Sequence, residues 1–151
     1  MENKHLSLIK QEYITGAQMQ DQLIKEQASR DLYFFNKYVL NVEDGEEKVE
    51  LAPFHKEVCQ FVTDNTKKKK LILIPRGHLK STLVTVGYSL FRLAKDPSIR
   101  ILIQNATYQT AADFVRAIKR HLQFNETFVR LYGNLALDPE EWSENRITLR
   151  T

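Results

Sequence analysis

The sequence predicts an α/β fold in which parallel strands alternate with helices, and three neighbouring segments lead to this prediction. Residues 71–74 are four aliphatic side chains between a charged run and a Pro-Arg-Gly turn, which is typical of a buried strand. Residues 81–95 are apolar around most of a helix, and residues 99–104 form a second apolar run. This order predicts a right-handed βαβ unit with the turn after residue 74 at a carboxyl end of the sheet.

The turn between the first strand and the helix has the residue types of a phosphate-binding loop. Residues 75–82 read Pro-Arg-Gly-His-Leu-Lys-Ser-Thr. A loop that runs into a helix N-terminus offers free backbone N–H groups and the positive end of the helix dipole to an anion. Lys80 would meet the β- and γ-phosphates, Ser81 would ligate Mg²⁺, and Arg76 could fork onto a terminal phosphate. The alternative is an ordinary strand-to-helix turn with a solvated lysine.

The loop departs from the G-x-x-x-x-G-K-[ST] pattern at both glycines. Ile74 stands at the first glycine position, and Leu79 stands at the second, directly before Lys80. Leu79 matters more, because a glycine there lets the backbone adopt a conformation that a side chain resists. Gly77 can relieve part of this strain. We therefore expect the backbone at Leu79 to decide whether the loop can hold a phosphate.

Pro-Arg-Gly-His-x-Lys-Ser-Thr resembles the deviant Walker A motif of the large terminase subunits of tailed bacteriophages, where an arginine stands early in the loop. The resemblance extends more weakly from about residue 51 onward. It implies a P-loop NTPase domain (ASCE, RecA-like), whose parallel sheet is flanked by helices, followed by an RNase H-like nuclease domain. The implied cofactors are ATP and Mg²⁺, with Lys80 and Arg76 in catalytic roles. The implied partners are double-stranded DNA, the portal protein, the small terminase subunit and further copies in a ring, in the host cytoplasm and with no membrane.

A second segment resembles the adenine-reading stretch of helicase-like and terminase ATPases. Leu51, Pro53, Phe54 and His55 match an apolar-Pro-aromatic-Gln pattern, with His55 at the glutamine position. An imidazole can offer one donor and one acceptor to adenine, as an amide does. The alternative for His55 is a helix-capping or surface role. The candidate nucleotide-binding residues are therefore Phe54, His55, Arg76, Gly77, His78, Leu79, Lys80, Ser81 and Thr82.

The first 50 residues predict a helical segment and an acidic loop. Residues 1–28 predict one or two amphipathic helices around Gly16, and Ser29 is the expected N-cap of the next helix, with Asp31 in its first turn. Residues 41–50 include five carboxylates around an Asp-Gly turn. The predicted organisation is an N-terminal segment over residues 1–50 and the first part of a P-loop ATPase domain over residues 51–151.

Three further patterns lie around the proposed βαβ unit. Four lysines at residues 67–70 predict a solvated loop or, alternatively, a contact with DNA phosphates. Asn-Ala-Thr at residues 105–107 resembles the loop that couples nucleotide to DNA in terminases and helicases; the alternative is a polar loop whose Thr107 or Thr110 caps the next helix. Trp142 and the alternation that follows resemble the segment leading to a Walker B strand; the alternative for Trp142 is a packing residue.

Composition is that of a globular domain. The chain has 151 residues, of which 42% are hydrophobic and 27% charged, and its net charge of +3 permits nucleic-acid contact without demanding it. Cys59 is the one cysteine, so we expect no internal disulfide and a reducing compartment. No apolar run reaches the roughly 20 residues of a membrane span, and no signal peptide is apparent.

The carboxylate that ATP hydrolysis requires is missing from the sequence pattern. Such a residue ends a buried strand and holds Mg²⁺, yet no four apolar residues are followed by Asp or Glu. Asp138 comes nearest, but its neighbours favour a turn. We therefore expect an N-terminal fragment that at most binds nucleotide and lacks the Walker B strand and the nuclease domain. The alternatives are a helicase-like P-loop ATPase and a non-catalytic DNA- or portal-binding module with a degenerate loop.

Overall fold

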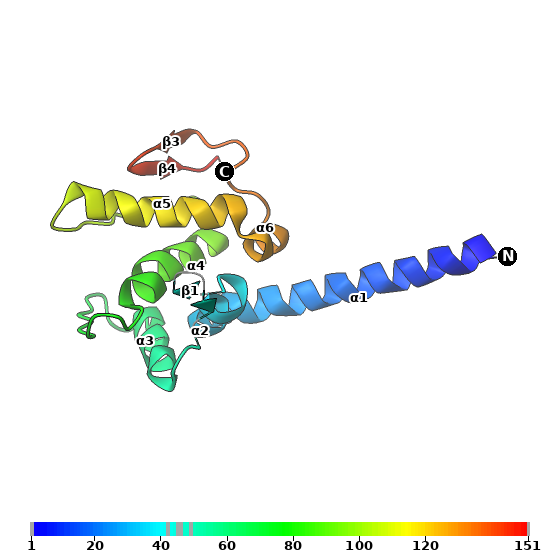
Figure 1. Ribbon diagram of the computed structural model, residues 1–151, viewed down its shortest axis with the longest axis horizontal. Helices are drawn as coiled ribbons and strands as arrows, with labels where there is room; N and C mark the ends of the chain where they lie inside the picture. The colour runs from blue at the N-terminus through cyan, green and yellow to red at the C-terminus, as the bar shows by residue number, and fades with distance from the viewer. Residues whose placement is uncertain (1, 42, 45–46, 49, 151) are drawn as a thin grey trace.

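The described part of the chain is mainly helical. The computed structural model describes residues 2–41, 43–44, 47–48 and 50–150, and the side chains of residues 16–41 and 50–150. A long helix, α1 (Glu2–Arg30), projects from a body that contains the other helices (Figure 1). Gly16 does not interrupt α1, so the prediction of one or two helices around it is resolved as one helix.

The chain turns sharply at Asp31. Its carboxylate accepts hydrogen bonds from the backbone N–H groups of Tyr33 (2.7 Å) and Phe34 (3.2 Å), so Asp31 is the N-cap of α2 (Leu32–Phe34). The prediction that Ser29 fills this position was wrong, because its hydroxyl donates to the Glu26 carbonyl inside α1. A π-helical segment, η1 (Phe35–Val39), follows directly.

The predicted acidic loop is described only in part. Two short antiparallel strands, β1 (Glu43–Asp44) and β2 (Glu47–Lys48), lie within it. Residues 42, 45–46 and 49, and with them the predicted Asp-Gly turn, lie outside the described residues.

Three predicted helices are confirmed. Helix α3 (Pro53–Thr63) begins at its proline, whose missing N–H is not needed in a first turn. The predicted helix over residues 81–95 consists of a π-helical segment, η2 (Ser81–Gly87), and α4 (Tyr88–Lys95). Helix α5 (Tyr108–Phe124) is capped by Thr107, which accepts from the Thr110 N–H at 3.2 Å. Helix α6 (Glu126–Tyr132), which no sequence pattern predicted, completes the body.

Phe35 lies at the centre of the core. Its side chain is fully buried, and its ring meets those of Phe91 (5.6 Å) and Phe128 (6.3 Å) edge to face. These rings come from η1, α4 and α6, so one aromatic cluster joins the N-terminal helices to the helix that follows the candidate phosphate loop.

The two π-helical segments pack on each other. Asn36 of η1 is completely buried, and a Cβ added to Gly87 of η2 would lie 2.0 Å from its Oδ1. Only a glycine permits this approach. Because π-helical turns are rare and often accompany functional sites, the packing of the helix that follows the loop is unusual.

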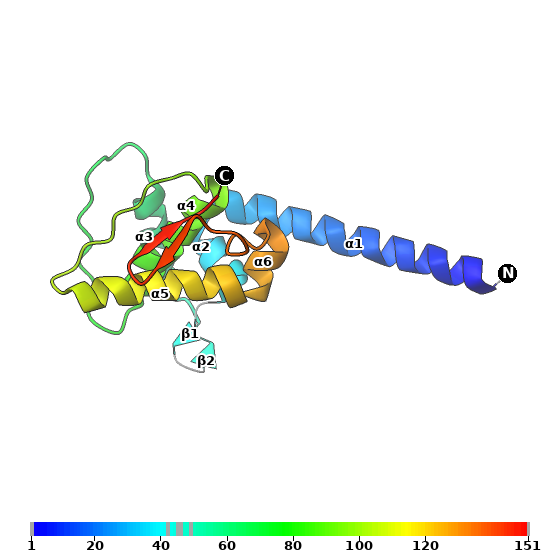
Figure 2. The ribbon, with the colours of Figure 1, turned by 90° about the horizontal axis from the view of Figure 1, so that it is seen from above.

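The strands expected at residues 71–74 and 99–104 are not paired with any described residue. The described sheets are β1–β2 and a hairpin of β3 (Glu141–Ser143) and β4 (Arg146–Thr148), which lies over α5 (Figures 1 and 2). The parallel sheet therefore stays a prediction. Burial nevertheless alternates along the first segment, since Leu71 and Leu73 are 77% and 81% exposed and Ile72 packs against the core. This is the period of a strand with one covered face.

Candidate nucleotide-binding loop

The loop before η2 has a left-handed backbone at two positions. Gly77 has φ +79° and Leu79 has φ +54°. Such a conformation is ordinary for glycine but costs other residues roughly 1–2 kcal/mol. Lys80 follows with φ −51° and ψ −54°, so a left-handed residue is succeeded by a right-handed one. Opposite hands at successive residues turn neighbouring N–H groups toward one side, an arrangement that can bind an anion and that we call the anion-binding hollow.

The side chains of this loop leave its polar face open. Leu79 is half-buried and packs against the hydrophobic core, so its side chain is anchored to the body. Lys80 and Arg76 are exposed, and neither side chain has a hydrogen bond or ion pair to another described residue. His78 closes the turn by a contact of 2.9 Å between its Nδ1 and the Arg76 carbonyl. The loop thus presents two unpaired cations beside a helix N-terminus.

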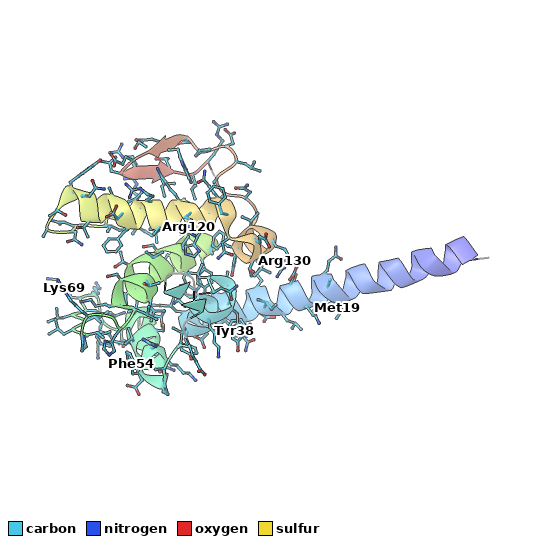
Figure 3. The ribbon with its side chains drawn as sticks, in the orientation of Figure 1. Met19, Tyr38, Phe54, Lys69, Arg120 and Arg130 are labelled. Atoms are coloured by element: carbon cyan, nitrogen blue, oxygen red, sulfur yellow. The ribbon has the colours of Figure 1, made fainter. Side chains whose placement is uncertain are left out.

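The start of α3 lies directly beside the loop. The ring of Phe54 is 5.8 Å from that of His78 and 3.9 Å from that of His55. Phe54 is labelled at the N-terminal end of α3 in Figure 3. The structure therefore brings together the two segments that the sequence singled out, although twenty or more residues separate them in the chain.

His55 caps α3 and is buried. Its Nδ1 accepts a hydrogen bond from the Ala52 N–H at 2.9 Å, and only 5% of the residue is exposed. Burial lowers the pKa of His55, while the neighbouring His78 backbone acts in the opposite direction. The capping role was one of the two alternatives derived from the sequence, and an imidazole buried in this way has little surface to offer an adenine base.

A lysine-rich turn connects α3 to the loop segment. Lys67, Lys68 and Lys69 are exposed, and Lys69 lies at the edge of the body in Figure 3. Lys70 instead donates from Nζ to the Val62 carbonyl at 2.5 Å. Asp64 is the nearby acid, and hydrogen bonds from Thr66 hold its pKa below the usual value. No ion pair joins Lys67, Lys68 or Lys69 to a described carboxylate, so most of the positive charge of this turn is unpaired.

The described residues offer a magnesium ion few protein ligands. No group of three or more His, Cys, Asp or Glu residues that could hold a metal is found among them. Ser81, the predicted ligand, begins η2 and is half-buried. Asp138 lies in a turn and pairs with Arg150 at 2.7 Å. Mg²⁺ at this loop would therefore rely on Ser81 and on oxygens of the nucleotide itself.

A cavity of about 550 Å³ adjoins the first turn of η2, and sequence reasoning did not foresee it. Thr82, the last candidate of the loop, lies on its wall with Val86, and Arg120, His121 and Phe124 of α5 face them. Arg120 and Phe124 are exposed and lie one turn apart on α5. No sequence motif connects them to residue 82, so no sequence signal pointed to this cavity.

No protein-family model, curated protein or solved structure matches this chain. No helix among the described residues combines the length and the apolarity needed to cross a bilayer. The function is therefore inferred from the loop and its surroundings.

Proposed function

We propose that residues 75–82 bind the triphosphate of ATP, and that the chain is the ATP-binding part of the motor subunit of a viral DNA-packaging terminase. The observation that carries the proposal is the left-handed backbone of Leu79, directly before Lys80. Bulky residues rarely hold this conformation unless the surrounding structure imposes it, and such strain gathers at functional sites. Here the Leu79 side chain packs against the hydrophobic core, which holds this residue in place.

The roles of the site residues follow from their positions. The N–H groups of residues 79–81 and the start of the helix over residues 81–95 would hold the β-phosphate, and Lys80 would neutralise the β- and γ-phosphates. Arg76 reaches from the same loop as a second cation for a terminal phosphate. Ser81 would supply the one hydroxyl for Mg²⁺, which adds charge neutralisation when the nucleotide is bound.

Hydrolysis requires more than the loop provides. Asp138 is engaged by Arg150 and lies on the turn that precedes the β3–β4 hairpin, so it is a poor Walker B carboxylate. We propose that the Walker B carboxylate and the nuclease domain belong to a longer form of the protein, and that this form couples ATP hydrolysis to translocation of double-stranded DNA. Its assembly would include the portal protein, the small terminase subunit and further copies of the chain in a ring, in the host cytoplasm.

Titration with a fluorescent ATP analogue tests the proposal. We expect micromolar, Mg²⁺-dependent binding, and Lys80→Ala should weaken it about tenfold or more, because a charge-assisted hydrogen bond contributes roughly 1.5–3 kcal/mol. Lys69→Ala is the matched control, since it removes an exposed lysine from the neighbouring turn. Equal binding by the wild type and Lys80→Ala would refute nucleotide binding at this loop.

The exposed lysines favour a second candidate, a non-catalytic module that binds DNA or the portal protein while the loop binds nothing. Lys67, Lys68 and Lys69 carry no ion pair to a described residue and could release counterions from a phosphate backbone. This module would show salt-dependent DNA affinity with no effect of nucleotide. A helicase-like ATPase would share the loop and differ by a second motor domain in place of the nuclease.

A further inference from the structure

The buried ring of His55 has a defined proton position. Since Nδ1 accepts from the Ala52 N–H, the proton of the neutral ring must lie on Nε2. The lowered pKa favours this neutral form. His55 therefore has one nitrogen committed to the helix cap and one N–H group available as a donor.

This N–H group is not satisfied by any described residue. Nε2 is fully buried, and no hydrogen bond to it meets the usual geometry, although the residue as a whole is 5% exposed and the His78 backbone is close enough to influence its pKa. A buried donor without a partner destabilises the state that contains it, and few are found in native proteins. The Nε2–H group of His55 therefore still needs a hydrogen-bond acceptor.

The polar group nearest to satisfying this donor belongs to the phosphate loop. The His78 backbone acts on His55, and the rings of Phe54 and His78 lie against each other at 5.8 Å. His78 stands between the two left-handed residues, Gly77 and Leu79. The His78 backbone is therefore the group placed to accept from Nε2–H if the loop tightens against α3.

We propose that His55 is a positioning residue for the phosphate loop, and that its Nε2–H donates to the His78 carbonyl when the loop closes on a triphosphate. This inference rests on the proposed function and replaces the adenine-reading role that the resemblance implies for His55. Because the ring lies behind the loop and away from solvent, it stabilises the loop whatever base the nucleotide carries. Affinity for the triphosphate alone should then depend on His55 as strongly as affinity for ATP.

Two substitutions at position 55 separate this role from base recognition, and the Nε2–H resonance separates it from helix capping. Gln is the conservative replacement, because its amide supplies an acceptor for the Ala52 N–H, as in a capping box, and a donor for the loop. His55→Leu removes both. Dissociation constants would be measured for ATP, GTP and inorganic tripolyphosphate, by displacement of the fluorescent ATP analogue from the full 151-residue chain.

We expect His55→Leu to weaken all three ligands by a similar factor of about five to ten, the worth of one buried hydrogen bond, and His55→Gln to restore them to within about twofold. In wild-type protein labelled with ¹⁵N-histidine, saturating tripolyphosphate should shift the Nε2–H resonance and slow its exchange with water. A purely capping histidine would show neither change. The resonance also tests the proposal if His55→Leu fails to fold.

Three results would overturn the inference. If His55→Leu weakened the binding of ATP alone, His55 would recognise the base. If His55→Leu bound all three ligands as the wild type does while Lys80→Ala bound them weakly, the nucleotide site would not depend on His55. An Nε2–H resonance that ignores bound tripolyphosphate would likewise exclude the hydrogen bond. Equal binding by the wild type and Lys80→Ala would instead remove the proposed function, and the positioning role with it.

Discussion

Replacing Leu79 by glycine and by alanine tests the left-handed backbone on which the proposed site depends. Both variants lose the same packing of the half-buried leucine against the core. They differ because alanine keeps the left-handed penalty of roughly 1–2 kcal/mol, whereas glycine avoids it and instead loses roughly 0.5–1 kcal/mol of chain entropy on folding. Leu79→Gly should therefore be more stable than Leu79→Ala by about 0.5–1 kcal/mol.

The sign of this difference is diagnostic, because it is reversed at ordinary helical positions. Leu93 of α4 is also partly buried against the core and lies within a helix. There, alanine should be more stable than glycine by about 1 kcal/mol. Urea denaturation of the four variants, analysed with a common slope, gives both differences. If Leu79→Ala equals or exceeds Leu79→Gly in stability, residue 79 is not left-handed in solution and the anion-binding hollow is lost.

Three further predictions concern the packing and titration of buried groups. Gly87→Ala should lower the unfolding free energy by about 1–3 kcal/mol, because its Cβ would overlap Asn36, and Asn36→Ala in the same chain should recover part of the loss in urea denaturation. Burial raises the pKa of Cys59 to about 11, so iodoacetamide should modify native protein far more slowly than protein in urea; equal rates would contradict this burial. The pKa of His55 lies below its ordinary value of 6.5, so the unfolded chain binds the proton first as the pH falls. Stability should therefore be full above pH 6.5 and decline below it, down to the native pKa, and this decline should be absent in His55→Gln.

Local patterns predicted the helices well, because capping and helix starts depend on neighbouring residues. Pro53 begins α3 and Thr107 caps α5, as their residue types indicate. Asp31 shows the limit of such reasoning. Both Ser29 and Asp31 are good N-caps, and only the continuation of α1 to Arg30 decides between them.

Strands and the site depend on distant residues, which a local pattern cannot supply. The aliphatic run at residues 71–74 has strand-like character, but a strand forms only where a partner offers its backbone groups, and no described residue does so. Lys80 and Arg76 could be recognised from their spacing. The backbone of Leu79 could only be posed as a question, and the burial of His55 follows from the packing of α3 beside the loop.

Exposed leucines near the loop bear on the choice between a motor and an adapter. Leu71, Leu73 and Leu102 are 77%, 81% and 89% exposed, and all three lie in the two segments predicted to be neighbouring elements of one sheet. Fully burying a leucine contributes about 1.5–3 kcal/mol, so covering the three would add several kcal/mol, a large share of the roughly 5–15 kcal/mol that stabilises a domain. A self-contained adapter would keep these three leucines exposed and would lack this stabilisation. A sheet that receives further strands along residues 71–74 and 99–104 would realise it and would provide the backbone partners these segments lack, which supports the ATPase domain over the adapter.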